Sequence, residues 1–107
     1  MSEIKFAIEG DAAIEATEDL LAIAGIDGSF IVDEEIQREG VLATIASIVG
    51  IVSGALAVAE QIRKWYQEYK QGKSGKKIAK VLIVGRNGDR LSLENATIEQ
   101  IRKVLEG

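Results

Sequence analysis

The chain has 107 residues, of which 47% are apolar and 28% are charged, a balance typical of an ordinary globular protein. This length fits one domain spanning residues 1–107. The sequence has no cysteine, which excludes disulfides and thiolate metal sites, and no histidine, the side chain that most often acts as general base or zinc ligand. We therefore predict a non-enzymatic protein with no catalytic, metal or cofactor site.

The net charge of −4 is unevenly distributed along the chain. Residues 1–39 carry a charge of −9, whereas residues 60–107 carry +5. This asymmetry favours docking between the two halves or head-to-tail association between chains. The N-terminus lacks the continuous apolar segment of a secretory signal, so we expect a cytoplasmic protein.

The first third of the chain predicts a strand, a helix and a second strand. Apolar residues alternate over residues 3–9, which indicates a half-buried strand. Apolar residues then recur at helical spacing over residues 11–24, and Gly25 follows as a helix stop. Residues 29–32 are aromatic or β-branched after the first position and predict a short second strand.

Residues 41–59 carry no charge and form the most unusual segment of the sequence. An amphipathic pattern continues from them as far as Tyr69. We predict a long apolar central helix, or two helices broken near Gly50 and Gly54, filling residues 36–71.

The last third predicts a β-hairpin followed by a helix. Strand-like runs at 78–84 and 91–93 flank the pair Asn87-Gly88, a strong hairpin signal because both turn positions of a type I′ turn need positive φ. Thr97 and Gln100 form a capping box that begins the terminal helix. The resulting order is β-α-β-α-β-β-α, an α+β fold with a four-stranded sheet and helices packed on one face.

A ridge of small residues suggests where the central helix makes contacts. The spacing of these residues would place them along one side of a helix, and Gly50 and Gly54 form a GxxxG pair that permits close helix packing. The interface predicted from this ridge and the apolar residues that follow it consists of Ala43, Ser47, Gly50, Gly54, Ala57, Ile62 and Trp65.

A helix that is apolar on all sides must be covered on all sides, and one sheet covers only one of them. We expect a second copy of the chain or an effector or adaptor protein to cover the rest. The alternative is a small membrane-associated protein in which residues 41–59 insert in the bilayer, since this segment would span about 28 Å as a helix. Its many small residues make insertion marginal.

Other candidate sites are weaker. The segment 85–88 lacks the ending of a phosphate-binding loop and precedes a strand. Five lysines between 70 and 80 are typical of a solvated linker, and nucleic-acid binding is unfavourable for an acidic chain with five aromatic residues.

The order of these motifs resembles the first type of effector-associated constant component, a small family found in bacterial biological-conflict gene clusters. The residues that carry the resemblance are Gly10, Asp11, Leu20, Leu21, Ile62, Trp65, Val81, Ile83, Asn87, Gly88, Leu91, Leu93, Ala96, Glu99, Ile101 and Leu105. The resemblance implies a non-enzymatic companion of effectors such as trypsin-like or caspase-like peptidases, or of their adaptor domains. It carries no catalytic residue over to this chain.

Overall fold

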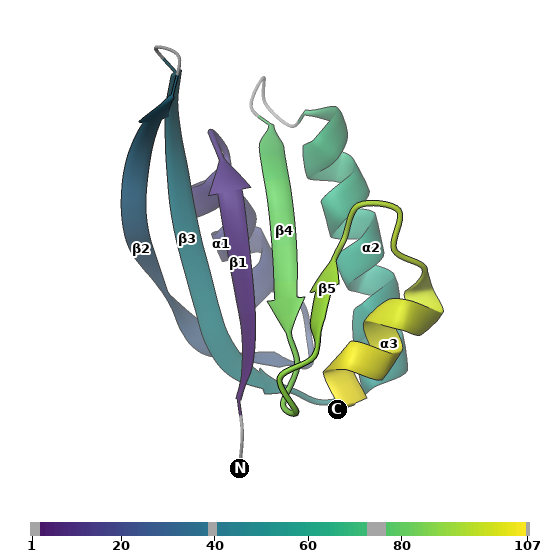
Figure 1. The fold of residues 1–107 in the computed structure, drawn as a ribbon. Coiled ribbons are helices and arrows are strands. Elements are labelled where there is room, and N and C mark those ends of the chain that lie inside the picture. The colour runs from purple at the N-terminus through teal and green to yellow at the C-terminus, as the bar shows by residue number, and fades with distance from the viewer. Residues whose placement is uncertain (1–2, 39–40, 73–76, 107) are drawn as a thin grey trace.

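The computed structural model describes residues 3–38, 41–72 and 77–106, except for the side chains of residues 33–44. The elements within these residues are β1 (Ile4–Gly10), α1 (Ala13–Leu21), β2 (Ile26–Arg38), β3 (Val41–Val52), α2 (Ala55–Gln71), β4 (Ile78–Val84), β5 (Arg90–Ser92) and α3 (Ile98–Glu106). The five strands form one antiparallel sheet in the order β2-β3-β1-β4-β5 (Figure 1). Strand β1 is therefore the middle strand.

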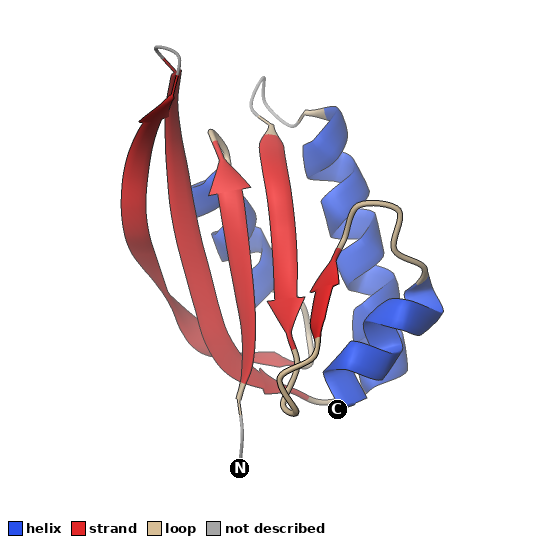
Figure 2. Cartoon of the chain, in the orientation of Figure 1, coloured by secondary structure: helices blue, strands red, loops and turns tan. Residues whose placement is uncertain are grey.

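The first six elements follow the β-α-β-β-α-β order of the ferredoxin-like split βαβ arrangement. Helix α1 connects β1 to β2 across β3, and α2 connects β3 to β4 across β1. Both helices lie behind the sheet, and α3 packs against α2 beside β5 (Figure 2). One sheet face is thus covered by α1 and α2, and we call the other the open face.

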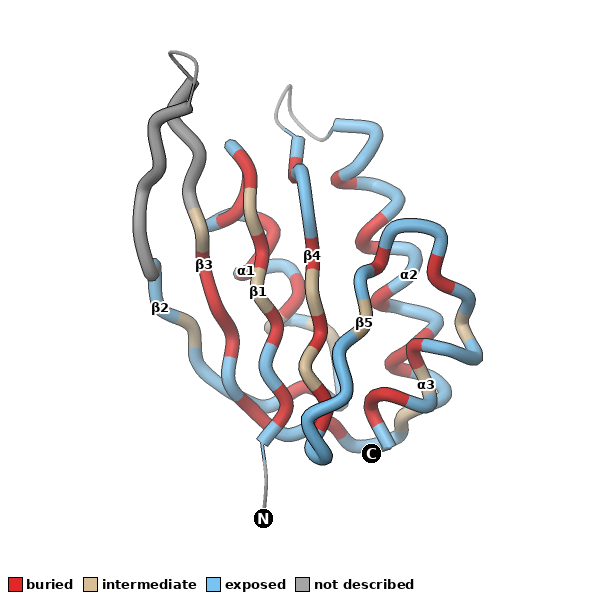
Figure 3. Tube along the Cα trace, in the orientation of Figure 1, coloured by how far each residue is buried: buried red, intermediate tan, exposed pale blue. Residues whose placement is uncertain are grey.

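The core lies between the sheet and these helices because side chains alternate along each strand. Buried residues alternate with more exposed ones along β1 (Figure 3). Ile4, Phe6 and Ile8 are buried against the helices, whereas Lys5 lies exposed on the open face. Helix α2 contributes the largest buried side chains of the helix layer. These are Trp65, Tyr66 and Tyr69, and the helix also buries Val58 and Ile62.

Trp65 and Tyr69 of α2 each donate a hydrogen bond to α1. The indole Nε1 of Trp65 donates to the carbonyl oxygen of Ala16 at 2.8 Å. The hydroxyl of Tyr69 donates to a carboxylate oxygen of Asp19. The rings of Trp65 and Tyr69 are themselves in contact, with centroids 6.0 Å apart. Trp65 therefore holds α1 and α2 together in the interior of the protein.

The predicted hairpin and capping box are confirmed. Strands β4 and β5 pair in register, and the turn places Gly88 at a φ of +88°. The expected type I′ geometry is wrong, because Asn95 is the only non-glycine residue with positive φ among those described. In the capping box, Gln100 N–H donates to Thr97 Oγ1 at 3.1 Å, and Thr97 N–H donates to Gln100 Oε1 at 2.9 Å.

The long apolar central helix is wrong, and with it the count of four strands. Residues 41–52 form β3, a second strand that returns along β2, and helix α2 begins only after Gly54. Gly54 has a φ of +73°, and this left-handed conformation interrupts the chain between the end of β3 and the start of α2. The described order is therefore β-α-β-β-α-β-β-α. The first helix is also shorter than residues 11–24, and the second strand is longer than residues 29–32.

The reason for the error is that the described part of β3 carries aliphatic side chains on both sheet faces. Ala46, Ile48 and Val52 point into the core, while Val49 and Ile51 point to the open face. A strand of this kind has no polar alternation, so its hydrophobic pattern is indistinguishable from that of a buried helix. Its high content of β-branched residues is the signal that favours a strand.

Candidate interaction surface

The open face of the sheet carries an apolar surface. Ile31 of β2 is 62% exposed, and Ile51 and Val49 of β3 are 47% and 37% exposed. The register places partly buried apolar side chains beside them on the same face: Ala7, Ile45, Leu82 and Val84. We refer to these seven residues, Ala7, Ile31, Ile45, Val49, Ile51, Leu82 and Val84, as the open-face patch.

The middle of this patch is hollowed by small side chains. Ser47 and Ala7 are paired in register on β3 and β1, and Leu82 continues the same row on β4. A hollow of about 230 Å³ lies next to this row, with Ile45 and Leu82 among its walls. The centre of the face therefore admits close approach by another surface.

Charged residues flank this row on both sides. Lys5 and Glu9 lie on the open face of β1, two residues before and two residues after Ala7. Lys80 of β4 is in register with Glu9. The apolar centre is thus bordered by a cation at one end of β1 and an acid at the other.

The residues of the predicted ridge do not share one face. Ser47 lies on the open face and is only 2% exposed, whereas Gly50 lies on the helix-covered side, opposite Gly28. Gly54 is in the turn before α2, and Ala57 is exposed on that helix.

The other three of the seven predicted interface residues lie in the core or in β3. Ile62 and Trp65 are buried in the core behind the sheet. Ala43 belongs to β3, but its side chain lies outside the described residues. The prediction that these residues form a ridge along one helix is therefore wrong. Their role in an interface stays a prediction.

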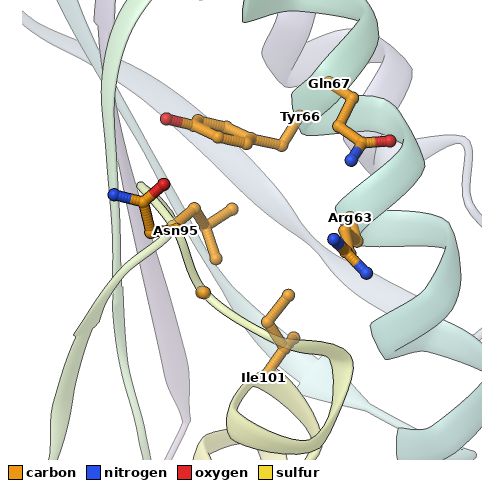
Figure 4. A pocket seen from close by; sticks show the side chains of 7 residues that line it. Arg63, Tyr66, Gln67, Asn95 and Ile101 are labelled. Carbon is orange, nitrogen blue, oxygen red and sulfur yellow. The ribbon is translucent and has the colours of Figure 1, made fainter.

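A second candidate site is a cleft between α2 and the segment that leads into α3 (Figure 4). Arg63, Tyr66 and Gln67 line it from α2, facing Asn95 and Ile101. Its volume is about 210 Å³, which is below the roughly 300–1,000 Å³ typical of small-molecule sites. The guanidinium and amides could hydrogen-bond an anionic group, but this set of side chains offers no nucleophile paired with a base.

The pKa of both tyrosines in the chain lies above the ordinary value. Burial raises the pKa of Tyr66, and the negative charge of Glu94 raises it further. Burial also raises the pKa of Tyr69, and its hydrogen bond to Asp19 adds to the effect because ionisation would remove the shared proton.

We expect these tyrosines to ionise at higher pH in the folded protein than in the unfolded chain, where the pKa is about 10. Their contribution to stability is complete below that pH and is lost as the pH rises toward the folded pKa values. Titration of tyrosinate absorbance, with and without denaturant, measures the difference, and circular dichroism shows that the native sample stays folded. Coincident titration curves would contradict the burial of both rings.

Metal and membrane sites find no support in the described part of the chain. Among those residues no group of three or more acidic side chains is placed to hold a metal ion. None of the helices in the described ranges is both long and apolar enough to cross a bilayer. The segment predicted to insert in the alternative interpretation, residues 41–59, is divided between β3, the Gly54 turn and the start of α2.

Comparison with known proteins leaves the resemblance to the effector-associated family as a prediction. The chain matches no protein-family model, no curated protein and no solved structure.

Proposed function

We propose that the chain is a non-enzymatic protein-interaction module that associates with itself through the open-face patch. The observation that carries this proposal is the exposure of Ile31, Val49 and Ile51 on one sheet face. An antiparallel sheet with one solvated face normally presents polar side chains there. Strand β3 instead presents Ile45, Val49 and Ile51 to that side.

Contact with another protein surface would remove this apolar area from water. At about 25 cal/mol for each Å² of buried apolar surface, covering several aliphatic side chains is strongly favourable. Contiguous exposed apolar area of this kind marks interaction sites in soluble proteins. A role as a scaffold beside an effector or adaptor in a bacterial conflict system remains the extension that the family resemblance implies.

The proposal is tested by placing a charge within the patch. Val49→Lys would bury an ammonium group in the contact, so we expect at least a tenfold weaker association, equivalent to about 1.4 kcal/mol. Sedimentation equilibrium from low micromolar to near millimolar protein measures the dissociation constant. Circular dichroism on the same samples shows that the fold is retained.

Leu56→Lys is the matched control, because Leu56 is 56% exposed on α2 and lies on the other side of the sheet. It should leave the dissociation constant unchanged. A wild-type protein that stays monomeric over the whole range would contradict self-association, and equal effects of the two variants would contradict the open face as its site.

A further inference from the structure

We propose that two copies of the chain stack open face to open face about a two-fold axis near Ala7, so that Lys5 of each copy meets Glu9 of the other. This inference rests on the proposed function and specifies its geometry. Its basis is the placement of opposite charges at equal distances from the centre of the middle strand.

The spacing along β1 provides the symmetry. Lys5, Ala7 and Glu9 alternate onto the open face, and each charged residue lies about 6.6 Å along the strand from Ala7. Consider a two-fold axis that lies in the plane of the interface, runs perpendicular to β1 and passes by Ala7. Rotation about this axis brings Lys5 of each copy opposite Glu9 of the other copy. Because the interface is isologous, this contact forms twice.

The charges also exclude the other simple arrangement. A two-fold axis parallel to β1 would place Lys5 against Lys5 and Glu9 against Glu9, and like charges directly opposite each other are unfavourable. Of these two axes, only the one perpendicular to β1 makes both charged contacts attractive, because each then joins Lys5 to Glu9. The long Lys and Glu side chains can accommodate the usual angle of about 30° between stacked sheets.

The same rotation matches the neighbouring strands. Val49 comes to face Ile45 of the second copy, and Val84 comes to face Lys80, whose aliphatic stem can lie over it while its ammonium group reaches water. The row that contains Ala7 and Ser47 faces itself across the axis. Small side chains at that point allow the sheets to reach their ordinary separation of about 10 Å.

The size of the face suits a dimer that exchanges with monomer. Strand spacings of about 4.8 Å and rises of about 3.3 Å per residue give a contact of roughly 20 Å by 17 Å. This footprint is about 340 Å² per copy, or roughly 700 Å² in total, which is below the ~1,200–2,000 Å² of standard interfaces and is typical of a weak, transient contact. Dimerisation should therefore depend on protein concentration between the low micromolar and the near-millimolar range, where a change in the dissociation constant is measurable.

The decisive experiment uses two charge-reversal variants. Lys5→Glu places acids on both sides of Ala7 along β1, and Glu9→Lys places cations on both sides of it. Each variant alone would bring like charges together twice, so we expect each to dimerise at least tenfold more weakly than the wild type. An equimolar mixture should form a heterodimer, because both contacts in it are again between opposite charges.

A change in net charge would not explain why mixing the two variants restores dimerisation. Lys5→Glu changes the net charge from −4 to −6 and Glu9→Lys changes it to −2, so both variants remain acidic and repel each other at long range. Lys64→Glu and Glu60→Lys are matched controls, since these exposed residues lie four apart on α2. Each control should keep the wild-type dissociation constant.

The outcomes separate the geometry from the function. Weakened variants that recover when mixed, measured by sedimentation with circular dichroism on each sample, support the two-fold axis near Ala7. A wild-type dimer that is unaffected by either reversal, or variants that stay monomeric when mixed, overturns this geometry while leaving self-association intact. A wild-type protein that is monomeric at every concentration overturns the proposed function itself.

Discussion

Gly50→Ala is expected to destabilise the protein by about 3 kcal/mol, the upper part of the usual range for added volume at a closely packed position. A Cβ atom at Gly50 would clash with the carbonyl oxygen of Asp27 and would lie 2.8 Å from the Cα of Gly28. Both are backbone atoms of β2, so neither can move aside without a shift of the strand. Chemical denaturation followed by circular dichroism measures the loss.

The sign of this effect distinguishes the strand from the helix that the sequence predicts. In a helix interior, replacing Gly by Ala would stabilise the protein by up to about 1 kcal/mol. Gly54→Ala provides a comparison, because its Cβ would meet open space and its positive φ costs only about 1–2 kcal/mol. A stabilised Gly50→Ala variant would contradict the β2–β3 pairing.

Trp65→Ala should lower the free energy of unfolding by about 3–5 kcal/mol, as expected for removal of a large buried aromatic side chain. Trp65 is 5% exposed, packs against Tyr69 and hydrogen-bonds to Ala16. Its loss would leave a cavity between α1 and α2 and would remove the indole donor from the carbonyl oxygen of Ala16. Denaturation monitored by circular dichroism is the suitable measurement, because this residue is the only tryptophan.

Trp65→Phe keeps most of the ring volume but removes the indole donor, so it should cost about 1 kcal/mol from the lost hydrogen bond, in addition to a smaller packing defect. These variants also test the sequence-based assignment of Trp65 to an interface. A Trp65→Ala protein with wild-type stability and a reduced molecular mass would place this side chain between molecules and contradict its role in the core.

The parts of the fold that could be predicted from sequence are those governed by local chemistry. The Thr97 and Gln100 capping box and the Gly88 turn depend on residues close together in the chain, so their signals survive without tertiary information. The alternation around Phe6 likewise identified β1, because its open-face residues include Lys5 and Glu9.

Strand β3 could not be predicted in this way because its environment is set by distant segments. Both neighbours, β2 and β1, bury its backbone, and its open face stays apolar. The contrast between a buried and a solvated face is then absent, and an amphipathic helix follows directly after Gly54. The sequence predicts an uncovered apolar surface on a helix, whereas the structure shows exposed aliphatic side chains on the sheet.

The open-face patch was missed for the same reason. Ile31, Val49 and Leu82 come from three strands, and only the sheet order brings them onto one side. The spacing of Lys5 and Glu9 is visible in the sequence, but its relation to the centre of a sheet is not.

The most direct test of open-face association uses the natural absence of cysteine, which leaves each introduced thiol as the only one in the chain. Ala7→Cys places a thiol at the proposed axis, and Leu56→Cys places one on an exposed position of α2. Treatment with a short bismaleimide, followed by mass analysis, should give a covalent dimer of twice 11.5 kDa for Ala7→Cys and mainly monomer for Leu56→Cys. Equal yields from both positions, or cross-linking only at Leu56→Cys, would contradict association through the open face.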